Sequence, residues 1–192
     1  MKNELIKMLS SMPSLSEGEA KEIADNITIQ TYKKGTILLK EGAISKECYS
    51  VLKGCVREYY IKDGEEKTTA FFTEGQEVVS FTSYTNQTPS KHYLSCVEES
   101  TLTVSSPEKE KEMYKRFPKL EVITRTMMEL NSGMAQEELA SFITSSPEEQ
   151  YMNLLENRSD LLNRVPQHQI ASYLGIKPES LSRIRKRIVS KF

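Results

Sequence analysis

Several features that define other classes of protein are missing or scarce in this chain of 192 residues. No hydrophobic run approaches the ~20 residues of a membrane-spanning helix, and the segment that begins with Met1 has no apolar stretch long enough for a signal peptide. The three cysteines, Cys48, Cys55 and Cys96, are an odd and widely spaced set, which does not suggest a disulfide framework. We therefore expect a cytoplasmic protein, not associated with a membrane, whose thiols are small buried side chains.

The sequence also lacks the parts of an enzyme. It has only two histidines, and no nucleophile, base and orienting group occur at a recognisable spacing. We expect no catalytic residue, no metal site and no cofactor. Hydrophobic residues make up 38% of the chain and charged residues 28%, which fits a soluble protein of one large or two small domains.

The N-terminal half of the chain reads as a β domain. Ser16 followed by Glu19 is typical of a capping box and predicts a short helix to about Ala24. Short β-prone segments follow at 27–32, 36–39, 49–52, 56–61, 68–72, 93–98 and 102–105, with glycines between many of them. Asp63-Gly64 predicts a tight hairpin. The pattern indicates an antiparallel barrel, roll or sandwich.

Helix-forming residues dominate from Pro107 to about Thr144. Within this stretch, hydrophobic residues recur at the 3,4 spacing of a coiled-coil seam over about two heptads: Leu120, Ile123, Met127, Leu130 and Met134. A helix packed on its own β domain would give the same pattern. The module that follows favours the seam, because DNA-reading helix pairs usually act as symmetric dimers. We therefore expect these five residues at a homodimer interface.

The most informative segment of the chain lies near its end. Small residues around Thr144 precede a helix that begins at Ser146-Pro147 and runs to about Arg158. The segment 167–187 then has a small residue, Ala171, where two helices would cross, and Gly175 at the turn. Pro178 suits the first turn of the second helix. Apolar residues stand where they would hold the two helices together: Ile170, Leu174, Ile176, Leu181 and Ile184. This pattern predicts a helix-turn-helix.

Charge separates this module from an ordinary helical hairpin in a protein core. Residues 159–192 contain seven Lys and Arg residues against two acidic residues, a net charge of +5. The whole chain carries a net charge of −1, so the remainder carries −6. A basic module on an acidic body is typical of a DNA-binding protein.

The order of these parts resembles the Crp/Fnr family of bacterial transcription regulators. The resemblance covers nearly the whole chain and is most specific between Val165 and Ile184. It implies an α+β fold with a cyclic-nucleotide-binding-like β jelly roll at 1–115, a long dimerisation helix at 116–145 and a helix-turn-helix domain at 146–192. Relatives usually continue into a wing hairpin, whereas this sequence stops at Phe192. The wing is therefore expected to be absent or minimal.

The resemblance assigns base reading in the major groove to Glu179 and Arg183. These residues stand four apart, so they share a helix face; Arg can donate two hydrogen bonds to guanine, and Glu can accept one from cytosine. Glu179 could instead be an acidic residue that only interacts favourably with the dipole at the start of the helix. Pro178 stands where many relatives have a base-reading Arg, so the recognised sequence is expected to differ. The remaining candidate DNA contacts are Gln167, Lys177, Ser180, Ser182 and Arg187.

The expected ligand site departs from the family pattern. Relatives that bind cyclic nucleotides carry a Gly-Glu pair and a later Arg-Ser or Arg-Thr. Here Ser80-Phe81 stands at the Gly-Glu place, no Arg follows, and Lys91 is the nearest cation. We do not expect cyclic AMP to bind; a different effector, or none, would use a pocket at Val79, Ser80, Phe81 and Lys91. An iron–sulfur centre or haem is not expected either, because no Cys precedes Cys48 and the sensor half has one His.

These observations predict a homodimeric regulator that reads an inverted repeat in double-stranded DNA, with RNA polymerase as a candidate partner. The alternative is a ligand-binding or protein-docking scaffold with a helix-turn-helix-like module.

Overall fold

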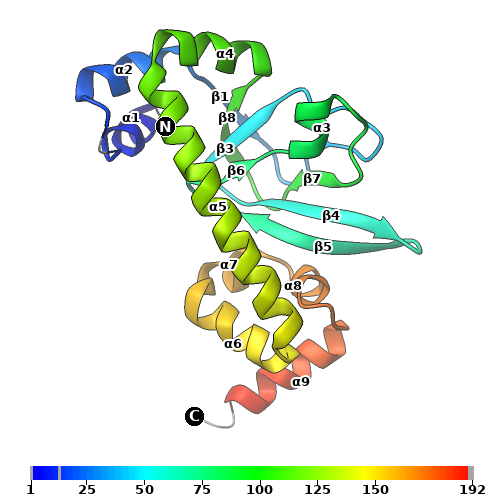
Figure 1. The fold of residues 1–192 in the computed structure, drawn as a ribbon. Coiled ribbons are helices and arrows are strands. Elements are labelled where there is room, and N and C mark those ends of the chain that lie inside the picture. The colour runs from blue at the N-terminus through cyan, green and yellow to red at the C-terminus, as the bar shows by residue number, and fades with distance from the viewer. Residues whose placement is uncertain (1, 13, 190–192) are drawn as a thin grey trace. The chain divides into compact units, whose positions relative to one another are not determined.

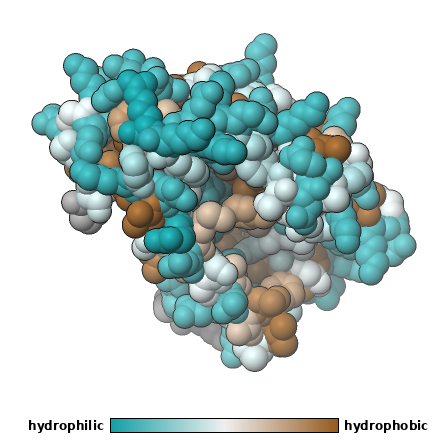
Figure 2. All heavy atoms as spheres, turned by 45° about the horizontal axis from the view of Figure 1, so that its top comes forward, coloured by the Kyte–Doolittle hydropathy of each residue, from teal (hydrophilic) through white to brown (hydrophobic). Residues whose placement is uncertain are grey.

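The computed structural model describes residues 2–12 and 14–189, which divide into two compact units. The first unit comprises residues 1–58 and 71–131, and the second comprises residues 59–70 and 132–192. Within the described residues, no helix is both long and apolar enough to cross a membrane. On the face drawn in Figure 2, hydrophilic side chains predominate and hydrophobic ones form small separate groups.

The first unit begins with two helices, α1 (Lys2–Ser10) and α2 (Glu17–Asn26). The capping box predicted at the start of α2 is confirmed. The Ser16 hydroxyl accepts a hydrogen bond from the Glu19 amide at 3.3 Å, and the Glu19 carboxylate accepts one from the Ser16 amide at 2.8 Å. The helix α1 was not predicted, although Leu5 and Leu9 bury one of its faces.

In the part of the chain that the structure describes, eight strands form two four-stranded sheets, and all seven predicted strand segments are among them. The first sheet has the order β1-β8-β3-β6, with bounds Thr28–Tyr32, Ser100–Ser105, Cys48–Lys53 and Glu77–Val78. The second has the order β2-β7-β4-β5, with bounds Ile37–Leu39, Tyr93–Cys96, Val56–Lys62 and Glu65–Phe72. The unpredicted strand β6 has only two residues, too few for an alternating pattern. The predicted antiparallel roll is confirmed.

The roll's core lies between the two sheets. Tyr49 pairs with Val104 across β3 and β8, and Val51 pairs with Leu102, so these side chains share one face. The core consists of Leu39, Tyr49, Val51, Val56, Val78, Leu94, Cys96, Leu102 and Val104. Burial of a large hydrophobic side chain contributes about 1.5–3 kcal/mol. The residues that alternate with them in β3 and β8 face away from the core.

The predicted hairpin joins β4 to β5 at Asp63-Gly64. Both residues have positive φ, 54° and 78°, as a two-residue turn of the primed type requires. The end of this hairpin belongs to the second unit, where the Thr68 amide donates to the Ser172 hydroxyl at 2.9 Å and that hydroxyl donates to the Glu66 carbonyl.

The predicted helical stretch after the roll is two helices, α4 (Pro107–Arg116) and α5 (Pro118–Thr144). They are separated at Phe117, which has φ −128° and ψ 79° because a following proline disfavours the helical conformation. Phe117 is buried among Leu5, Leu9 and Ile23 of α1 and α2. Figure 1 shows these N-terminal helices beside α4 and the start of α5.

The second unit consists mainly of four helices after α5: α6 (Pro147–Asn157), α7 (Ser159–Arg164), α8 (Gln167–Tyr173) and α9 (Pro178–Val189). The predicted start of α6 is confirmed by a capping box between Ser146 and Glu149. The helix α7 was not predicted. The buried apolar side chains of these four helices and of the residues that follow α7 and α8 are Tyr151, Leu154, Leu161, Val165, Ile170, Ala171, Leu174, Leu181, Ile184 and Ile188.

Candidate nucleic-acid interface

The turn between α8 and α9 ends the first helix with a Schellman motif. The Ile176 amide donates to the Ala171 carbonyl at 2.9 Å, and the Gly175 amide donates to the Ser172 carbonyl at 3.1 Å. Gly175 has φ 66°, the left-handed conformation that this motif places after a helix end and that glycine adopts without strain. The role predicted for Gly175 in the turn is confirmed.

The second helix of the pair begins directly after Lys177. The Lys177 carbonyl accepts hydrogen bonds from the amides of Ser180 and Leu181 at 3.0 and 3.1 Å. Pro178 occupies the first helical position, where its missing N–H leaves no intrahelical bond unmade. The boundary of α9 is therefore set by local chemistry, as the sequence predicted.

The helix α9 has one apolar face and one polar face. Leu181, Ile184 and Ile188 are buried against the rest of the unit. On the opposite side, Glu179, Ser182, Arg183 and Lys186 are exposed at the spacing i, i+3, i+4, i+7 of a single helix face. Sequence reasoning did not include Lys186 among the contact residues, although this spacing could have identified it.

The other predicted DNA contacts differ in their surroundings. Gln167 at the start of α8 and Lys177 at the turn are exposed, whereas Ser180 is half-buried. Arg187 is exposed and forms an ion pair of 2.8 Å with Glu148 of α6. Their contact with DNA stays a prediction. Residues 190–192, which include Lys191 of the charge count and the expected wing position, lie outside the described residues.

The five residues predicted for a dimer interface are not equally accessible. Leu120 and Ile123 pack against the cluster formed by α1, α2 and Phe117. Met127 is half-buried, while Leu130 and Met134 are 64% and 63% exposed. Further apolar side chains on α5 that the seam pattern did not include are also exposed: Val122, Met128, Leu139, Phe142 and Ile143. The dimer interface stays a prediction.

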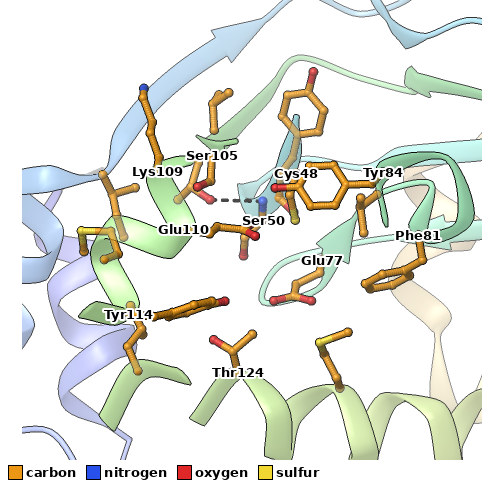
Figure 3. A pocket seen from close by; sticks show the side chains of 18 of the residues that line it. Cys48, Ser50, Glu77, Phe81, Tyr84, Ser105, Lys109, Glu110, Tyr114 and Thr124 are labelled. Carbon is orange, nitrogen blue, oxygen red and sulfur yellow. Dashed lines mark hydrogen bonds between the residues drawn. The ribbon is translucent and has the colours of Figure 1, made fainter. Parts of the chain in front are cut away.

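The four predicted ligand residues lie between β6 and β7 but do not converge on one space. The Ser80 hydroxyl is buried 3.4 Å from the Ser90 hydroxyl, and Lys91 is exposed. Val79 and Phe81 instead line a cavity of about 390 Å³ in the first unit. Phe81 belongs to the short helix α3 (Phe81–Asn86) and its ring points into this cavity (Figure 3). A ligand site at these four residues stays a prediction.

Comparison with known proteins identifies relatives of both units. Residues 29–117 match the cyclic nucleotide-binding domain family. The chain is 25% identical over 169 residues to the nitrogen fixation regulation protein FixK of Rhizobium meliloti, a match that covers 81% of this chain and 72% of that protein.

Solved structures share the fold. A CooA variant from Carboxydothermus hydrogenoformans superposes with a TM-score of 0.71 at 14% identity, covering 97% of this chain and 84% of that one. FixK2 from Bradyrhizobium japonicum gives a TM-score of 0.68 at 17% identity, covering 86% and 85% of the two chains. The FixK relative is by name a regulation protein. Residues 29–117 therefore form a domain of the cyclic nucleotide-binding type, and the chain as a whole is similar in sequence to FixK and in fold to the CooA and FixK2 structures.

Proposed function

We propose that this chain is a homodimeric, sequence-specific DNA-binding regulator that inserts α9 into the major groove. The observation that carries the proposal is the division of α9 into a buried face and an exposed polar face. The buried face fixes the helix against α6, α7 and α8, so that Glu179, Arg183 and Lys186 project from a rigid support. An exposed helix of this kind fits the groove, which admits one α-helix.

The chemistry of the exposed face fits base recognition. The Arg183 guanidinium can donate two hydrogen bonds to O6 and N7 of one guanine, a geometry that few other base edges accept. Glu179, one turn earlier, can accept a hydrogen bond from a cytosine amino group. Gln167 and Lys177 stand at the start of α8 and at the turn, where phosphate contacts would fix the register of the module on the duplex.

The homodimer is proposed to form through α5. The seam spacing continues at Met127, Leu130 and Met134, beyond the start of α5 that packs on α1 and α2. Leu130 and Met134 are exposed. A second copy of this chain would bury these side chains against their own counterparts. Two recognition helices related by a two-fold axis would then read half-sites about one turn of DNA, ~34 Å, apart.

We also propose that the regulator does not respond to cyclic AMP. A cyclic phosphate is usually held by an Arg fork, and Ser80, Ser90 and Lys91 do not supply one. Ser80 and Ser90 are buried and lie against each other, so neither hydroxyl is presented to solvent.

The test is selection from a randomised duplex pool with the purified full chain, at near-physiological salt and with no nucleotide added. Enrichment of an inverted repeat supports a dimeric reader. Retention of DNA without enrichment, even with an effector panel, contradicts it. A variant with Arg185, Lys186 and Arg187 changed to Gln should bind all duplexes more weakly, with a shallower salt dependence. An unchanged salt dependence would instead favour a module that docks another protein.

A further inference from the structure

The cavity of about 390 Å³ in the first unit lies on the outer face of the first sheet. Tyr49 and Val104 point toward the roll's core, so the alternating residues Cys48, Ser50 and Thr103 point to the opposite side. The helices α3, α4 and α5 supply the other walls (Figure 3). The cavity therefore lies mainly on the side of the sheet opposite the core, with Tyr49 and Val104 at its border, and its volume falls within the range of small-molecule sites.

Two carboxylates face this cavity from different elements. Glu77 projects from β6 and Glu110 from α4, and Figure 3 shows both side chains directed into the same space. Burial raises the pKa of both carboxyl groups, and the charge of Glu110 raises the pKa of Glu77 further. The neighbouring Tyr84 hydroxyl and Cys48 thiol lower the pKa of Glu110, but by less than burial raises it.

Little in the described residues compensates this negative charge. Lys109 is the one cation among the described lining residues, and its Nζ lies 3.4 Å from the Thr28 hydroxyl. Within residues 2–12 and 14–189, no ion pair involves Glu77 or Glu110. The Tyr84 hydroxyl oxygen is buried there without a hydrogen-bond partner of ordinary geometry. The cavity therefore presents two carboxylates, with the Tyr84 hydroxyl beside Glu110, to whatever occupies it.

The apolar part of the lining suits the same kind of occupant. The rings of Phe81, Tyr84 and Tyr114 come from two helices on different sides of the space, and Figure 3 shows the Tyr114 ring extending into it. Aromatic faces attract cations through the ring quadrupole, most strongly where water is excluded. Met113 and Met128 add polarizable side chains that adapt to an apolar body.

We propose that this cavity binds a small organic cation, a protonated amine or quaternary ammonium group on an apolar body, with its charge between Glu77 and Glu110. Such a ligand would replace repulsion between two carboxylates by two attractive contacts. An anionic ligand such as a cyclic nucleotide would instead bring its phosphate against them. Because Thr124 and Met128 of α5 line the cavity, occupancy would also act on the proposed dimerisation helix. That last step rests on the proposed function, whereas the binding itself does not.

The test is calorimetric titration of the full chain with phenethylamine and benzyltrimethylammonium. The matched probes are 2-phenylethanol, which has the apolar body without the charge, and cyclic AMP, which carries the opposite charge. We expect saturable binding of the cations and at least about tenfold weaker binding of the alcohol and the nucleotide. Absence of saturable binding by both cations, or equal affinity for 2-phenylethanol, would overturn the proposal.

Isosteric variants locate the site. Glu110→Gln and Glu77→Gln should each weaken cation binding about tenfold or more, while Glu112→Gln serves as the control, because Glu112 lies exposed on α4 outside the cavity. Circular dichroism confirms that each variant is folded. Loss of affinity in the control as great as in the other two would place binding elsewhere. The result of DNA selection with the same proteins does not depend on the result of these titrations. The two proposals are therefore tested separately.

The pH dependence of binding supplies a second readout. Affinity for benzyltrimethylammonium, whose charge does not titrate, should fall as pH is lowered and Glu77 and Glu110 gain protons. The other titratable side chains that line the cavity are Cys48 and Tyr49 on β3, Tyr84 on α3, and Tyr114 and Lys109 on α4. The pKa values of the thiol and of the three phenols are raised by burial, so these four groups stay neutral as the carboxyls titrate. Affinity that does not change with pH would contradict the proposal.

Discussion

The Arg187 guanidinium lies 2.8 Å from the Glu148 carboxylate and thereby links the last turn of α9 to the first turn of α6. Glu148 makes two favourable interactions: the ion pair with Arg187, and the interaction of an acid near a helix N-terminus with the helix dipole. The same contact engages a cation that was predicted to bind a phosphate. Arg187 must therefore exchange one anionic partner for another if it is to contact DNA.

A first prediction follows from this competition. Glu148→Gln should remove the anionic partner that competes with phosphate for Arg187 and so strengthen binding to duplex DNA of any sequence, with a salt slope steeper by about one unit. Glu156→Gln makes the same charge change at an exposed site on α6 and is the control. Fluorescence anisotropy at several salt concentrations measures both. Equal effects of the two substitutions would show that net charge alone, and not the ion pair, determines the result.

A second prediction concerns the turn of the helix pair. Gly175→Ala should lower the free energy of unfolding by about 1 kcal/mol, because a Cβ at φ 66° is strained although there is space for it. Gly133→Ala is the matched control in the interior of α5, where open space and helical backbone should raise stability by roughly 0.5–1 kcal/mol. Urea denaturation monitored by circular dichroism distinguishes them. Equal signs of the two changes would contradict the account of the turn.

A third prediction addresses the proposed dimer. Substitution of both Leu130 and Met134 by Glu should convert the dimer to a monomer, because two like charges would meet their counterparts across a two-fold axis. Substitution of both Leu139 and Ile143 by Glu changes two exposed apolar residues off the seam spacing and should leave the dimer intact. Sedimentation equilibrium gives the mass of each. A dimer that survives the first pair of substitutions would exclude the proposed seam.

A fourth prediction concerns acid stability. Hydrogen bonds from the Ser16 amide, the Lys119 ammonium and the Ser16 hydroxyl hold the pKa of Glu19 at about 2, below the ordinary 4.5. A lowered pKa in the folded state means that this stabilisation is complete above pH 4.5 and is lost as pH falls toward 2. Glu19→Gln should therefore lower Tm at pH 6 and have little effect near pH 2. Glu17→Gln, in the same helical turn, is the control and should show no such trend.

Local chemistry explains which parts of the fold the sequence could predict. Ser16, Asp63-Gly64, Gly175 and Pro178 each set a helix end or a turn through contacts with near neighbours, and all four were found as predicted. The break at Phe117 also has a local cause, the following Pro118, but the sequence analysis did not use this proline to divide the helical stretch. The short elements β6 and α7 have too few residues to establish a period.

The candidate sites show the same difference between features set by local sequence and features set by the packing of distant segments. Glu179 and Arg183 share a face by helical spacing alone, so their exposure could be anticipated from the sequence. The pairing of Glu148 with Arg187 depends on how α6 packs on α9, and the meeting of Glu77 with Glu110 depends on how α4 packs on the roll. No periodicity within one segment contains that information.

The central claim is that α9 reads bases through Arg183. The most direct measurement compares the binding of two variants, Arg183→Ala and Arg185→Ala, to two duplexes. Arg185 is a neighbouring exposed Arg that lies off the base-reading face. One duplex is the selected site, and the other has one guanine replaced in each half-site. We predict that Arg183→Ala loses the preference for the guanine, about 1–3 kcal/mol per contact, while Arg185→Ala weakens both duplexes equally and keeps the preference. Full discrimination by Arg183→Ala would contradict the account.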